Sequence, residues 1–82
     1  MADWKEKIVL GNGEELRRVG SKSTGFMGET DVDTYDVVDG QGATVGSVIV
    51  EDHTAVRGFK RTISVVQRDA AGALIFSESW TA

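Results

Sequence analysis

Two copies of one turn signature, thirty positions apart, constrain this chain more than any other feature of its sequence. Residues 39–43 read Asp-Gly-Gln-Gly-Ala and residues 69–73 read Asp-Ala-Ala-Gly-Ala, each between runs rich in β-branched residues. In such a turn the Asp side chain accepts hydrogen bonds from later backbone N–H groups, and the Gly takes the left-handed conformation that lets the next strand leave in register. The signature predicts two β-hairpins. Because hairpins converge easily, we interpret the repetition as recurring turn chemistry rather than duplication.

Alternation of apolar and polar residues predicts six strands. The first is expected over residues 4–10, and the Asn-Gly pair that follows predicts a tight hairpin. Residues 14–19 are interpreted as a short return strand, with one helical turn as the alternative. A loop rich in Gly, Ser and Thr is expected over 20–28. The remaining strands are expected at 29–38, 43–51, 59–68 and 73–81.

These strands predict an all-β fold: a six-stranded antiparallel β-meander, curled into a small barrel or half-barrel, in one domain over residues 1–82. The imperfect alternation of the third strand predicts a bulge near Thr34. In a curled sheet Trp4 and Trp80 would cover the seam between the first and last strands. The alternative is that each Trp fills its own end of the core.

The last strand shows how side chains should divide between the two faces of the sheet. Successive residues of a strand point to opposite faces. Leu74, Phe76 and Trp80 are therefore expected on one face, with Ile75 and Ser77 on the other.

Composition restricts the class of protein. The chain has no cysteine, so neither a disulfide nor a thiolate metal site supports the fold, which fits a cytoplasmic location. No apolar stretch approaches the roughly 20 residues of a membrane span, so no membrane association is expected. The net charge of −4 disfavours direct binding of nucleic acid through phosphate neutralisation. Without proline, the edges of the sheet must be protected by charge or by closure.

The residues that usually carry catalysis or hold a metal form no pattern here. The single histidine, His53, follows two acids on a strand end, where neighbouring side chains point apart, so we interpret it as a solvated loop residue. Asp31, Asp33 and Asp36 resemble a calcium loop but lack its central Gly and closing Glu. No nucleophile elbow or phosphate loop occurs. We therefore expect no enzyme activity, no metal and no cofactor.

Charge is distributed very unevenly along the chain. Residues 29–52 contain seven acids and no Lys or Arg, whereas residues 53–68 contain four bases and no acid. One interpretation is cross-strand pairing of these segments. The other is an acidic face for a basic partner, in which Asp31 and Asp33 lie about 6.7 Å apart on one side of a strand and imitate successive phosphates. Asp36 is included in this candidate surface.

Phe26 and Met27 form the other candidate contact, because an aromatic and a Met on a Gly-flanked loop are typical interface anchors. The alternative is a plug over one end of a barrel. We therefore expect a small binding protein that occupies the basic surface of another protein, as small acidic inhibitors of phages and mobile elements do. A self-associating structural module, and hence a homo-oligomer, is the second hypothesis. A β-barrel that binds a small ligand is the third.

Overall fold

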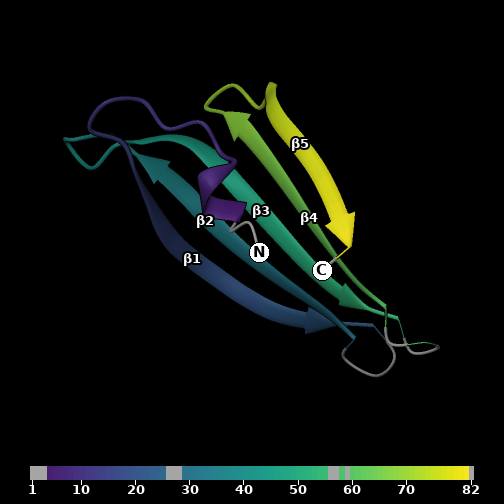
Figure 1. The fold of residues 1–82 in the computed structure, drawn as a ribbon. Helices are drawn as coiled ribbons and strands as arrows, with labels where there is room; N and C mark the ends of the chain where they lie inside the picture. The colour runs from purple at the N-terminus through teal and green to yellow at the C-terminus, as the bar shows by residue number, and fades with distance from the viewer. Residues whose placement is uncertain (1–3, 26–28, 56–57, 59, 82) are drawn as a thin grey trace.

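The computed structural model describes residues 4–25, 29–55, 58 and 60–81, which form one antiparallel sheet and a short 3-10 helix. The elements are η1 (Trp4–Glu6), β1 (Glu15–Thr24), β2 (Thr30–Val38), β3 (Thr44–Thr54), β4 (Arg61–Asp69) and β5 (Leu74–Thr81). The strands pair in chain order, so the fold is a five-stranded all-β meander with β1 and β5 as its two edges (Figure 1). No helix within the described ranges is long and apolar enough to cross a membrane.

The two Asp turns have the predicted geometry. The Asp39 carboxylate accepts hydrogen bonds from the backbone N–H groups of Gln41 and Ala43, at 2.9 and 3.0 Å. The Asp69 carboxylate accepts the two equivalent bonds, each at 2.9 Å. The glycine in the fourth position of each turn has a φ of 84° or 86°, a conformation that side chains disfavour. The prediction of both hairpins is confirmed.

Each Asp turn is followed by a β-bulge at the same offset. Val45 is the extra residue of β3, because Thr44 and Gly46 pair with consecutive residues of β2. Ile75 is the extra residue of β5, because Leu74 and Phe76 pair with consecutive residues of β4. Both bulged residues stand six positions after the Asp of their turn. A bulge bends its strand and redirects a side chain, so the repeated signature places two β-branched side chains as well as two turns.

The core lies on one face of the sheet, called the covered face because the N-terminal segment, residues 4–10, packs over it. Its centre consists of buried valines from three adjacent strands: Val37, Val48, Val50 and Val65. Ile8 of the N-terminal segment completes this cluster. Gln67 is 2% exposed, accepts a hydrogen bond from the Val9 N–H at 2.8 Å and donates one to the Val9 carbonyl at 2.6 Å. The opposite face, called the open face, has no covering element among the described residues.

The prediction of a first strand over residues 4–10 is wrong, and the sheet therefore has five strands instead of six. Trp4 lies in η1, and its ring centroid is 5.0 Å from that of Tyr35. Ile8 is buried against the sheet, and the Val9 backbone is bound by the Gln67 side chain rather than by a neighbouring strand. The apolar residues of this segment thus cover one face of the sheet. An alternating pattern alone does not distinguish such a covering segment from a strand.

The predicted loop over residues 20–28 is also wrong in its first part. β1 continues to Thr24, and residues 20–24 pair with residues 30–34 of β2. The bulge expected near Thr34 lies in the partner strand, where Val19 is the extra residue opposite Tyr35 and Thr34. A bulge of this kind adjusts the register of both strands. At the far end of the sheet, β3 runs three residues beyond its predicted end, to Thr54.

The predicted barrel or half-barrel is wrong, because the sheet is neither closed nor strongly curled. With five strands and no pairing between β1 and β5, there is no seam to cover. Trp4 and Trp80 instead both pack against the core cluster on the covered face. The Lys7 ammonium lies 5.2 Å from the centroid of the Trp80 ring. The N-terminal segment thus covers the apolar side chains of one face, which a closed barrel would have enclosed.

Candidate functional site

The acidic residues of β2 are engaged within the molecule. Arg18 forms an ion pair with Asp33 at 3.0 Å, and Arg17 forms one with Asp36 at 3.2 Å. The Ser23 hydroxyl donates a hydrogen bond to Asp31 at 2.6 Å. These partners belong to β1, the neighbour of β2, rather than to the basic segment that follows residue 52. The expected pairing of the acids in residues 29–52 with the bases in residues 53–68 is therefore wrong for Asp33 and Asp36, whose ionic partners lie in β1.

The three aspartates do not share one surface. Asp31 and Asp33 have the same parity in β2 as Val37, so they project from the covered face. Asp36 has the opposite parity and projects from the open face. A partner on the covered face would therefore contact Asp31 and Asp33, whereas only a partner on the open face would contact Asp36.

One acid of the next strand does pair with the basic segment, as one interpretation of the sequence expected. Asp52 of β3 accepts hydrogen bonds from the Arg61 guanidinium of β4, at 2.8 and 3.0 Å from Nε. This hydrogen bonding holds the pKa of Asp52 below its ordinary value of 3.8. Next to it, His53 is exposed, and its Nδ1 lies 2.7 Å from the Thr30 hydroxyl. The described residues contain no group of side chains that could hold a metal ion.

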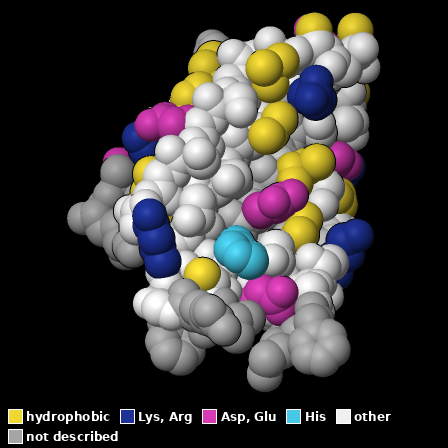
Figure 2. All heavy atoms as spheres, turned by 90° about the vertical axis from the view of Figure 1, so that its right-hand side faces the viewer, with side chains coloured by type: hydrophobic (Ala, Val, Ile, Leu, Met, Phe, Trp, Pro, Cys, Tyr) yellow, Lys and Arg dark blue, Asp and Glu magenta, His cyan; other side chains and the backbone are white. Residues whose placement is uncertain are grey.

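Phe26 and Met27 lie outside the described residues, so their predicted role as an apolar anchor stays a prediction. The described part of the chain offers a different apolar surface. Val9, Leu10, Leu74 and Ile75 are exposed by 59%, 41%, 57% and 47%. Figure 2 shows the molecule from the β5 side, with apolar side chains gathered toward its upper end. The two Asp turns lie at this same upper end in Figure 1. We call these four residues the turn-end surface.

A hollow of about 240 Å³ adjoins two residues of the turn-end surface. Val9 and Ile75 line it together with Val45, so both bulged side chains and the N-terminal segment contribute to one depression. Gly46 is a further wall, and a Cβ built there would lie 2.7 Å from the Arg68 carbonyl oxygen. Glycine therefore allows β3 and β4 to approach each other at this point. The Gln67 side chain fixes Val9 beside the hollow through its two hydrogen bonds.

The charged rim of this hollow is largely acidic. Glu14 and Asp69 both line it, together with Arg68. Glu14 Oε1 accepts a hydrogen bond from the Gly11 N–H at 2.6 Å, which holds the carboxylate in place beside the N-terminal segment. An apolar hollow with carboxylates at its rim suits an apolar side chain presented among basic residues.

Sequence reasoning missed this surface because the bulge at Ile75 reverses the expected faces. Leu74 pairs with Arg68, which projects from the open face, so Leu74 does not share the face of Phe76. Ile75 contributes to the hollow with Gln67 of the covered face. A signal was present, since both Asp turns have a β-branched residue six positions after the Asp.

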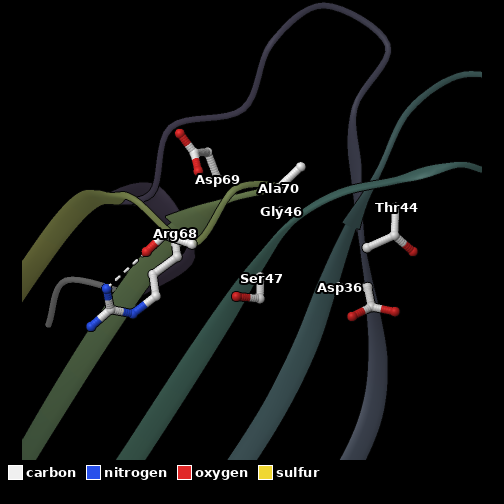
Figure 3. A pocket seen from close by; sticks show the side chains of 8 residues that line it. Asp36, Thr44, Gly46, Ser47, Arg68, Asp69 and Ala70 are labelled. Atoms are coloured by element: carbon white, nitrogen blue, oxygen red, sulfur yellow. Dashed lines mark hydrogen bonds between the residues drawn. The ribbon is translucent and has the colours of Figure 1, made fainter.

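A second hollow, of about 310 Å³, lies on the open face near the same turns. Ser47 stands between Asp36 and Arg68 in the strand register, and Figure 3 shows these side chains along the pocket. Arg68 Nη1 donates to the Gly72 carbonyl at 3.1 Å, and Asp36 is already paired with Arg17. The remaining N–H groups of Arg68 can bind a carboxylate or carbonyl oxygen.

Comparisons with family models, curated proteins and solved structures find no match for this chain.

Proposed function

We propose that the protein is a non-enzymatic binding protein that acts by occupying the surface of another protein, with the turn-end surface as its apolar anchor. The observation that carries this proposal is one hollow lined by the exposed apolar side chains of Val9 and Ile75, with exposed Leu10 and Leu74 adjacent to them in the chain. Burying one fully exposed side chain of this kind contributes about 1.5–3 kcal/mol, and because these four are 41–59% exposed, each can contribute about half of that on binding. Exposed apolar clusters rimmed by polar groups are typical of interaction sites.

The partner is expected to be basic around its contact residue. Glu14 and Asp69 stand at the rim of the hollow, and the chain as a whole carries a net charge of −4. Such a charge accelerates association with a basic surface at low salt and loses this effect as salt screens it. A Leu, Ile or Met side chain flanked by Lys or Arg has the chemistry that this arrangement fits.

The acidic strand remains the alternative contact. For Asp33 and Asp36 to bind a partner, each must exchange its ion pair with a β1 arginine for a new one. Exposed pairs of this kind contribute only about 0–1 kcal/mol, so the exchange costs little but also gains little. The apolar anchor therefore supplies the larger share of affinity in this proposal.

The test compares three baits with the native protein in a host lysate at low and high salt. One carries Val9→Asp with Ile75→Asp, one carries Asp31→Lys with Asp33→Lys, and the control carries Val19→Asp, which alters a 52% exposed side chain on the opposite edge of the sheet. We expect a basic protein to be retained by native and Val19→Asp baits, and lost, through about tenfold or greater weakening, from the Val9/Ile75 bait. Equal retention by that bait refutes the turn-end surface, and selective loss from the Asp31/Asp33 bait favours the acidic strand.

A further inference from the structure

The two edges of the sheet differ in how they resist pairing with another strand. β1 has four charged residues among its ten (Glu15, Arg17, Arg18 and Lys22) and a bulge at Val19. Charges and bulges are the usual devices that keep an edge strand from adding a further strand. β1 is therefore a blocked edge.

β5 lacks most of these devices. Glu78 is its one charged residue among eight, and the Lys7 ammonium of the same chain lies 3.4 Å from the Glu78 carboxylate. The bulge at Ile75 lies near the start of the strand, which leaves residues 76–81 regular. Within the described residues, β5 pairs only with β4, so the backbone groups on its outer side are available. An edge of this composition is suited to pairing with a further strand.

We propose that β5 pairs antiparallel with β5 of a second copy of this chain, around a two-fold axis, to give a continuous sheet of ten strands. Such a contact uses the same strand on both copies and therefore closes on itself. The two β1 edges are then the outer edges, and their charges and bulges stop further addition. The asymmetry between the edges thus favours a second copy and limits the assembly to a dimer.

Charge selects the register of this pairing. Residues that face each other across antiparallel strands lie on the same side of the sheet. At the two-fold axis, one residue of β5 must therefore lie opposite the same residue of the second copy, and this residue is the centre of the pairing. Centring on Glu78 would oppose two carboxylates. Centring on Ser79 places Glu78 opposite Trp80 of the second copy, above which that copy's Lys7 ammonium lies at 5.2 Å from the ring centroid. Each Glu78 then stands near two ammonium groups, and the Ile75 bulge is outside the paired region.

The expected dimer is weak. Stable interfaces bury upward of about 1,000 Å² in total, and pairing of one short strand falls at the low end of this range. A dissociation constant on the order of 10–100 μM is therefore expected. The pairing does not rest on the proposed function, because none of the turn-end residues takes part in it.

The first measurement is sedimentation velocity of the native protein from 5 to 500 μM at about neutral pH. We expect a concentration-dependent shift from monomer to dimer with no larger species. Ser79→Lys places two ammonium groups opposite each other and should weaken the dimer by about tenfold or more. Ser21→Lys, a matched change of an exposed serine on β1, should leave it unchanged. Circular dichroism verifies that both variants keep the sheet.

Disulfide trapping tests the register. Because the chain has no cysteine, any disulfide in a single-cysteine variant must join two copies. Across an antiparallel pair the Cα atoms are about 4.5–5.5 Å apart, which a disulfide can bridge. Ser79→Cys should therefore be trapped as a dimer much faster than Ser21→Cys under the same mild oxidation. A native protein that is monomeric at 500 μM, or equal trapping of the two variants, overturns the proposal.

Discussion

Gln67 offers the most direct test of how the N-terminal segment is held on the sheet. Its side chain is almost fully buried and binds both the N–H and the carbonyl of Val9, at 2.8 and 2.6 Å. Gln67→Met keeps the length and the unbranched shape of the side chain but removes both hydrogen bonds. The contact between these two residues joins positions 58 apart in the sequence, so the variant weakens a long-range connection without creating a large cavity.

The expected loss follows from these two bonds. Each contributes about 1 kcal/mol net, give or take half, so their removal should lower the free energy of unfolding by about 2 kcal/mol. Because Val9 is 59% exposed, water can reach part of its freed backbone, and the larger penalty of a sealed unpaired group does not apply. In a domain of this size, each 1 kcal/mol corresponds to about 4–8 °C in Tm, so Tm should fall by about 8–16 °C.

Urea denaturation followed by Trp fluorescence measures the change, since Trp4 lies in the segment that Gln67 holds. Hydrogen exchange at the Val9 N–H is the local readout and should accelerate more than exchange at Val48, in the centre of β3.

Gln67→Glu is the second variant: its carboxylate would stand against the Val9 carbonyl oxygen, so burial should raise its pKa. Because the folded state then binds the proton more tightly, this variant should regain stability as pH falls, whereas Gln67→Met should not. A free energy within 0.5 kcal/mol of native, with unchanged Val9 exchange, would refute the argument.

Three further changes test the sheet itself. Gly46→Ala places a Cβ 2.7 Å from the Arg68 carbonyl oxygen, so β3 and β4 must separate, and unfolding curves should show a loss of about 1–3 kcal/mol. Asp69→Ala removes two backbone hydrogen bonds and should cost about 1–2 kcal/mol, while Asp69→Asn, which keeps the acceptor oxygen, should cost clearly less; equal losses would contradict the turn mechanism. The pKa of Asp52 is lowered by its hydrogen bonds to Arg61, so the pair should stabilise the fold above about pH 4 and lose this effect as pH falls through the lowered pKa. The Asp52→Asn variant should lack this acid-dependent component in a series of denaturation curves from pH 7 to pH 2.

Local chemistry was readable from the sequence wherever a few adjacent residues decide the outcome. The two Asp turns are of this kind, because the side chain, the N–H groups it binds and the left-handed glycine all lie within five positions. Most of the strand pattern of the C-terminal half followed from the positions of the turns. Bulges did not, since the extra residue is defined only relative to a partner strand. The faces of Leu74 and Ile75 were consequently reversed.

The N-terminal half was harder to predict for two physical reasons. The apolar residues of the segment 4–10 could have faced a core from a strand or from a covering segment, and only the distant Gln67 decides between them. Residues 20–24 contain no apolar side chain, yet they pair as an exposed edge, where no buried face is required. Arg17 and Arg18 do lie in the predicted strand 14–19, but the missed pairing of residues 20–24 changes its register on β2, so their ion pairs with Asp36 and Asp33 could not be predicted either.

The long separation between Val9 and Gln67 also has a consequence for synthesis of the chain. Each strand of the meander can pair with the strand made just before it, so the sheet can grow by adding neighbours as it leaves the ribosome. The segment that covers the core precedes the sheet in the chain, yet Gln67 of β4, which binds its Val9 backbone, is made 58 residues after Val9. Trp4 can pack against Tyr35 as soon as β2 is made, but the Val9 backbone keeps its hydrogen bonds to water until β4 supplies Gln67, so the segment is fully fixed only after β1, β2 and β3 have been made.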